Sequence, residues 1–239
     1  MHSPRSAVLE MGVVSMSNRV SVKNKRGLAL VETTLALAVG AAVMLGVVHM
    51  LQQTNSDLRA RTLAEQQQAF MNAAGNFYLA NAEKMLAAMA DGTDAASFCV
   101  VGANAGTGVG GTVSNDTNLK TCALDADWLK WKQAIPAGFK SVNPHNQRWV
   151  AIFKRVYEGA TATDAVEMLV VGANVGGIAT TVTDLRELQS AAELVGGAGG
   201  YVPDKDRVVC KYSTPANTYE ACGTQGGWKV DLKKFVNTL

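Results

Sequence analysis

One carboxylate lies near the start of a long apolar run, directly after a basic segment. Three of the four residues at 23–26 are Lys or Arg, Gly27 follows, and residues 28–51 then hold no basic residue and one acid, Glu32. A carboxylate in such a run is costly, so we expect it to have a partner. Cleavage after Gly27 would place the new ammonium of Leu28 one helical turn from Glu32, where it could neutralise this carboxylate or that of a neighbouring chain. The alternative is a Glu that reaches the lipid headgroups.

The apolar run is long enough to cross a membrane. Its 24 residues include 11 Leu or Val, and as a helix they would extend about 36 Å, against a hydrocarbon core of about 30 Å. The run exceeds the roughly 7 to 15 apolar residues of a secretory signal and no Ala-x-Ala site ends it. A plain signal anchor would leave Gly27 and Glu32 unexplained. The basic flank predicts that the N-terminus stays in the cytoplasm.

Four cysteines follow the apolar run: Cys99, Cys122, Cys210 and Cys222. None forms a Cys-x-x-Cys motif or lies near a His at ligand spacing, so we expect no metal site. In an oxidising periplasm an even number of cysteines predicts disulfides. Three pairings are open, and proximity in the sequence favours the first with the second and the third with the fourth. Each bridge would contribute about 3 kcal/mol by chain entropy. Free buried thiols are the alternative.

The remaining reactive side chains do not form a catalytic motif. Beyond residue 27 the histidines are His49, in the apolar run, and His145, in a loop where we expect it at the surface. No Gly-x-Ser-x-Gly or His-Glu-x-x-His motif occurs. Four carboxylates fall where helices are expected to start, and capping accounts for them: Asp125, Asp127, Asp184 and Glu187. We therefore predict no catalytic residue and no cofactor.

Two further classes of ligand find little support. The glycine-rich stretch 106–111 lacks the Gly-Lys-Ser/Thr ending of a phosphate-binding loop, and we interpret it as a turn. Residues 28–239 carry 17 basic and 19 acidic side chains, without a basic patch interleaved with aromatics. Direct binding of nucleic acid is therefore not expected.

A long helix is expected to carry the apolar run and continue beyond it. Apolar residues recur at intervals of three, four and seven between residues 63 and 89, which predicts one buried stripe. The helix should run from residue 28 to about 79 and extend past Asn81. Small residues spaced four apart within the run, such as Ala36 and Gly40, would let identical helices approach closely.

The rest of the chain predicts an α+β head, with an antiparallel sheet laid on the long helix. Strands are expected at 148–157, 166–171, 207–212 and 228–232. A short helix should begin after Asp125 and stop before Pro136, and a second should run from a cap at Thr183 or Asp184 to Val195. The pentapeptide Val-Val-Gly-Ala-Asn occurs at 100–104 and 170–174, and we interpret both copies as turns.

The junction at Gly27 resembles the processing site of type IV pilins and pseudopilins. Their signature is a basic leader ending in Gly, followed by an apolar helix with Glu as its fifth residue, which is the position of Glu32. The resemblance implies that a prepilin peptidase cleaves after Gly27 and methylates the amino group of Leu28. It also implies that Glu32 docks each subunit onto its neighbour's N-terminus. The long leader resembles the type IVb branch, with Met11 and Met16 as alternative starts.

The C-terminal half is similar to the constant region of shufflon-type minor pilins, which are tip or adhesin subunits of conjugative pili. The segments that carry this similarity, mainly through their glycine patterns, are 170–177, 185–188 with 192–201, and 227–235. Together the resemblances imply the type IV pilin fold, with a leader at 1–27, a long helix at 28–90 and a head at 91–239.

The expected function is that of a major or minor pilin in adhesion, motility or conjugation. Its partners would be other pilin subunits and the prepilin peptidase. The chain would cross the inner membrane once with its head in the periplasm, and then join an extracellular pilus. Two alternatives remain open at this point: a pseudopilin of a type II secretion system, and a single-span periplasmic enzyme.

Overall fold

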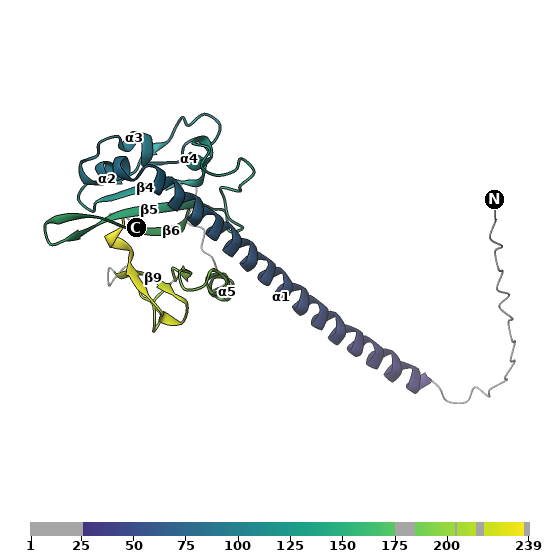
Figure 1. The fold of residues 1–239 in the computed structure, drawn as a ribbon. Helices are drawn as coiled ribbons and strands as arrows, with labels where there is room; N and C mark the ends of the chain where they lie inside the picture. The colour runs from purple at the N-terminus through teal and green to yellow at the C-terminus, as the bar shows by residue number, and fades with distance from the viewer. Residues whose placement is uncertain (1–25, 175–184, 204, 214–217, 237–239) are drawn as a thin grey trace, which may run out of the picture. The chain divides into compact units, whose positions relative to one another are not determined.

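The computed structural model describes residues 26–174, 185–203, 205–213 and 218–236, with side chains for the same residues apart from 26–33, 36 and 225. The chain divides into two compact units, Met1–Leu51 and Gln52–Leu239. The longest helix, α1 (Arg26–Ala80), contributes its first half to one unit and its second half to the other (Figure 1).

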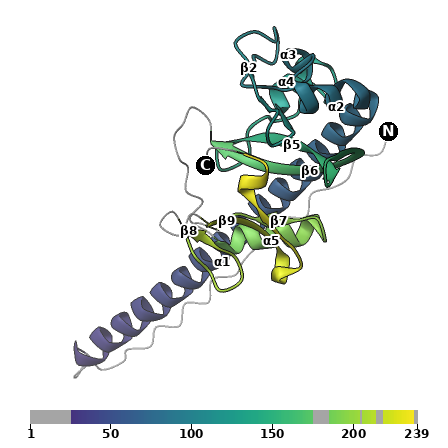
Figure 2. The same cartoon turned by 90° about the vertical axis from the view of Figure 1, so that its left-hand side faces the viewer.

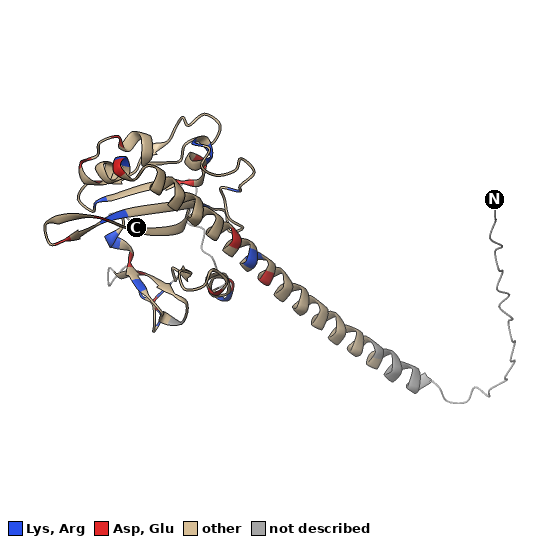
Figure 3. Cartoon of the chain, in the orientation of Figure 1, with Lys and Arg blue, Asp and Glu red and all other residues tan. Residues whose placement is uncertain are grey.

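In the first unit, α1 is apolar on every side. No Lys, Arg, Asp or Glu occurs between residues 33 and 51, and Figure 3 shows the described part of this stretch without charge. Its large side chains are exposed, as in Leu37 at 73% and Met44 at 74%. A helix that is hydrophobic all round is typical of a membrane span or of a helix buried by partners.

In the second unit, α1 ends at Ala80, and helical structure resumes directly after Asn81. The Asn81 side-chain amide donates a hydrogen bond of 2.8 Å to the Phe77 carbonyl, which satisfies a group at the helix end. Helix α2 (Ala82–Asp91) follows and is closed by Gly92 at φ 87°, whose N–H bonds the Ala88 carbonyl. The predicted long helix is therefore confirmed to Ala80, and its extension past Asn81 is a separate helix.

A four-stranded antiparallel sheet lies against the second half of α1. Its strand order is β3-β4-β5-β6. The element bounds are β3 (Asn115–Asp116), β4 (Thr121–Asp125), β5 (Gln147–Glu158) and β6 (Thr161–Asn174). The strands β5 and β6 form a long hairpin with a register shift near Arg155. Around this sheet lie α3 (Ala95–Phe98), α4 (Ala126–Trp131) and the short pair β1 (Val100–Val101) and β2 (Thr112–Val113).

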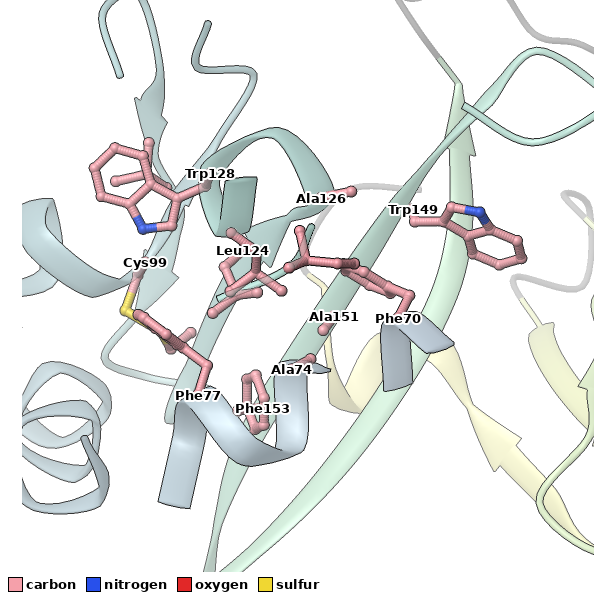
Figure 4. Packing of buried hydrophobic residues seen from close by; sticks show 14 of the residues in the cluster. Phe70, Ala74, Phe77, Cys99, Leu124, Ala126, Trp128, Trp149, Ala151 and Phe153 are labelled. Atoms are coloured by element: carbon pink, nitrogen blue, oxygen red, sulfur yellow. A yellow bond between two sulfur atoms is a disulfide. The ribbon is translucent and has the colours of Figure 1, made fainter. Parts of the chain in front are cut away.

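Alternation along the strands divides the core into two layers. The face toward α1 carries every second residue of β5, as Trp149, Ala151 and Phe153. Figure 4 shows these side chains with residues of α1 and β4, among them Phe70, Ala74, Phe77 and Leu124. Full burial of a side chain such as Phe70 contributes about 1.5–3 kcal/mol. The predicted apolar stripe is confirmed at six of its seven positions, because the residues at 63, 70, 74, 77, 85 and 89 are buried, whereas Tyr78 is half-buried.

The opposite face of the sheet is covered by the end of the described chain. Val150 and Ile152, which alternate with the residues above, pack with Phe235. Phe235 follows the turn η2 (Leu232–Lys234). Both faces of β5 are therefore buried over residues 149–153.

A second, smaller sheet and α5 (Leu185–Val195) complete the second unit (Figure 2). Strand β9 (Thr218–Gly223) pairs with β7 (Gly200–Tyr201), β8 (Tyr212–Ser213) and β10 (Lys229–Asp231), and η1 (Thr224–Gly226) links β9 to β10. Helix α5 packs beside α1, where the Gln68 amide reaches the Val195 carbonyl at 3.5 Å. Gly196, at φ 87°, ends α5 as predicted; the predicted caps Thr183 and Asp184 lie outside the described residues.

Three strand predictions are confirmed and one is wrong. Strands at 148–157, 166–171 and 228–232 correspond to β5, β6 and β10. Residues 207–211 are not a strand: the Arg207 N–H bonds the Cys210 carbonyl in a tight turn, and Val208 is 96% exposed. Strands β4 and β9 were not predicted from the sequence. Their Cys and Ala residues have little intrinsic strand preference, and pairing with neighbouring strands determines their conformation.

The repeated pentapeptide adopts two conformations. At 100–104 it is β1 followed by a turn, as predicted. At 170–174 it is the end of β6, so the turn prediction is wrong there. A Cβ on Gly172 would lie 2.8 Å from Gln147 Oε1, so a larger residue there would require the Gln147 side chain to move.

Candidate functional site

The predicted processing site lies in the first turns of α1. The helix begins at Arg26, so Gly27, Leu28 and Glu32 all have helical backbone. Leu28 and Glu32 are four residues apart, which places their positions one above the other on the same face of the helix. The leader up to residue 25 and the side chain of Glu32 lie outside the described part of the chain.

The apolar surface that follows is the largest exposed hydrophobic feature of the described residues. Ten large apolar side chains between positions 35 and 51 are each more than half exposed. Among the described residues, one helical stretch, Leu37–Ala80, is long and apolar enough to cross a membrane by length and composition. Such a surface is compatible with a membrane anchor or with association between helices.

Two disulfides join the four cysteines. Cys99 is bonded to Cys122 and Cys210 to Cys222, which is the pairing that proximity favours among the three possible. All four are fully buried. Glu220 lies close to Cys210 and Cys222, a group of side chains that could hold a metal ion. Both sulfurs are bonded to each other in the disulfide, so they offer no thiolate to a metal.

His145 is not the surface residue that the sequence suggests. Its Nε2 lies 3.0 Å from Glu187 Oε1, and the two side chains are 15% and 4% exposed. Glu187 lies in the first turn of α5, where capping was the predicted role. The pair links the loop before β5 to α5, positions 42 residues apart in the sequence. No periodic pattern connects such positions, so sequence reasoning could not find the pair.

Asp125 caps α4 as predicted and also anchors a polar network. Its Oδ1 accepts the Trp128 N–H at 2.8 Å and its Oδ2 accepts the Gly102 N–H at 2.7 Å. The same Oδ2 lies 3.5 Å from Arg148 Nη1. Burial raises the pKa of Asp125, although the hydrogen bonds and Arg148 act in the opposite direction.

Asp127 shares the guanidinium of Arg148. Its Oδ2 lies 3.5 Å from Arg148 Nε, and its Oδ1 accepts a hydrogen bond from Ser141. The sequence assigned Asp125 and Asp127 to helix capping. In the structure their carboxylates also connect α4 to Gly102 and to Arg148 of β5. With both oxygens of Asp125 occupied, this cluster is a structural link.

Glycines at 196–201 and Gly223 of β9 lie close to one tryptophan, Trp228. A Cβ on Gly200 would lie 2.4 Å from the Trp228 ring, and one on Gly223 would lie 2.5 Å from Trp228 Nε1. The indole N–H donates to the Gly197 carbonyl at 3.0 Å. The structure thus brings the segments at 196–201 and 227–235 together. Gly200 and Gly223 pack so closely against the Trp228 ring that a side chain at either position would overlap it.

No protein-family model, curated protein or solved structure matches this chain. The functional argument therefore depends on the residues and on their placement in the fold.

Proposed function

We propose that this chain is a structural subunit, a major or minor pilin, of a type IVb-like pilus for adhesion, motility or conjugation. A prepilin peptidase would cleave after Gly27 and methylate Leu28. The head, residues 91–239, would fold in the periplasm, and assembly would withdraw the apolar helix from the inner membrane into a filament of pilin subunits.

The observation that carries the proposal is the arrangement of one helix. Glu32 is the fifth residue after Gly27 and the single acid of a 24-residue apolar run, and the same helix continues as the central helix of an α+β head. Apolar side chains exposed on all sides of the first half need either lipid or other helices around them. A subunit that moves from bilayer to filament uses both environments in turn.

N-terminal mass spectrometry of the exported protein tests the cleavage. We expect a mature chain that starts at Leu28 with a methylated amino group. Recovery of a chain that still carries residues preceding Gly27 contradicts the proposal and favours a single-span periplasmic protein. Gly27→Ala retains a small residue at the junction and tests how strictly the peptidase requires Gly.

Glu32→Ala tests assembly separately from cleavage. We expect the variant to be cleaved normally but absent from sheared surface filaments, because its N-terminal ammonium has no carboxylate partner in apolar surroundings. Glu65→Ala, an exposed acid on the same helix outside the apolar run, is the matched control. Electron microscopy of a deletion strain separates a pilus from a secretion pseudopilus: intact pili with lost secretion would contradict a role in the pilus.

A further inference from the structure

Lys132, directly after α4, has a positive charge without a carboxylate partner in the described part of the chain. Its Nζ lies 4.2 Å from the ring centroid of Trp131 and 4.8 Å from that of Trp128. The ion pairs among the described residues do not include it. Partial burial lowers the pKa of the ammonium. The two rings stabilise the charge, but they leave its hydrogen-bond donors for another acceptor.

Lys132 is also one of the residues that line a groove of about 580 Å³ between α1, α3 and the residues after α4. Three alanines, Ala73, Ala80 and Ala134, line the groove, and their small side chains leave it hollow. Phe98 contributes an aromatic wall. The volume is within the range of about 300–1,000 Å³ that small-molecule sites occupy.

The polar lining suits neutral hydroxyl groups beside one negative charge. Asn76 is exposed, and among the described residues no hydrogen bond involves its amide. Asn81 uses its amide N–H on Phe77 and keeps its carbonyl oxygen as an acceptor. Among the residues that the structure describes, no Asp or Glu lines the groove. A second cation, Lys84, lies 5.8 Å from the centroid of the Phe98 ring.

We propose that this groove binds an acidic saccharide through its carboxylate. The carboxylate would accept from the Lys132 ammonium, hydroxyls would pair with Asn76 and Asn81, and a pyranose face would lie against Phe98. One ammonium without a guanidinium fork acts as a point charge, which is sufficient to pair with the single negative charge of a carboxylate. The site does not depend on filament assembly, and it could serve an isolated head as well as a pilus.

The test uses the full chain in detergent micelles and saturation-transfer NMR with three probes. Methyl glucuronide carries both ring and carboxylate, methyl glucoside the ring alone, and acetate the carboxylate alone. We expect the glucuronide to bind at least about tenfold more tightly than either control, since a charge-assisted hydrogen bond is lost with the glucoside. Acetate binding as tightly as the glucuronide would overturn saccharide recognition, and so would the absence of binding by all three.

Variants locate the binding in the groove. Lys132→Gln should weaken the glucuronide at least about tenfold, and Ala134→Leu should abolish binding by filling the groove. Lys140→Gln removes an exposed lysine that does not line the groove and should leave affinity unchanged. Equal affinity of wild type and Lys132→Gln would show that Lys132 serves only the packing of the two tryptophans, and the proposal would be wrong.

Discussion

At the scale of single residues, the described chain uses its buried charges to hold segments together. Asp125 is fully buried, yet both of its oxygens accept backbone N–H groups and one faces Arg148. Removing one partner from such a cluster leaves an uncompensated group, which costs more than the pair contributes. His145 and Glu187 form a comparable link on the other side of the head.

Asp125→Asn should change how stability depends on pH. Burial raises the pKa of Asp125 in the folded state, so the folded chain binds its proton more tightly than the unfolded chain. The tighter proton binding by Asp125 therefore stabilises the folded chain fully below the ordinary Asp pKa of about 3.9. This stabilisation decreases as the pH rises toward the raised pKa of the folded state. The Asn variant keeps a capping oxygen but lacks this dependence.

The measurement is urea unfolding of the full chain in detergent micelles, followed by tryptophan fluorescence between about pH 3.5 and 7. The unfolding free energy of wild type minus that of Asp125→Asn should decrease as pH rises through this window. Asp164→Asn, in an acid that is 94% exposed, should show little of this trend. The same slope in both variants would contradict the assignment to Asp125.

At the scale of elements, close contact between backbone and an indole determines where glycine is required. Gly200→Ala should destabilise the chain by about 1–3 kcal/mol, because the added methyl overlaps the Trp228 ring and the Cys222 carbonyl oxygen. Gly197→Ala, where a Cβ meets no atom within 4 Å, should stay within about 0.5 kcal/mol of wild type. Thermal unfolding measures both, and Trp228→Phe in the Gly200→Ala background should recover part of the loss. Equal losses in the two alanine variants would show that Trp228 is not the cause.

The elements also show what the sequence could and could not predict. The stripe from Leu63 to Met89 identified the buried face of α1 and α2, because helical periodicity is a local signal. Strand β4 was not predicted, because its residues have little intrinsic strand preference. Its extended conformation comes from antiparallel pairing with β5. For the candidate site, Gly27 and Glu32 could be found from charge pattern alone. The groove at Lys132 could not, because α1, α3 and the end of α4 meet there only in the folded chain.

At the scale of the whole molecule, charge and cysteine usage point to the same topology. Five of the 22 basic residues precede Gly27, and all four cysteines follow the apolar run. The positive-inside rule keeps a basic flank in the cytoplasm, and disulfides persist on the oxidising side. The prediction that the head is exported therefore has two independent physical reasons.

Thiol labelling of the exported chain tests this topology. Both bridges should be closed. A maleimide added in denaturant, which exposes the four buried cysteines, should therefore label no cysteine before reduction and four after it. The double variant Cys210→Ala, Cys222→Ala should leave the Cys99–Cys122 bridge intact, because the two bridges close separate loops, with sequence separations of 23 and 12. Loss of the second bridge should lower the free energy of unfolding by about 3 kcal/mol through chain entropy. A cytoplasmic control, made by deleting residues 1–51, should be labelled at all four cysteines without reduction. Labelling of the exported chain before reduction would show that the head stays in a reducing compartment, and both the topology and the filament would then be excluded.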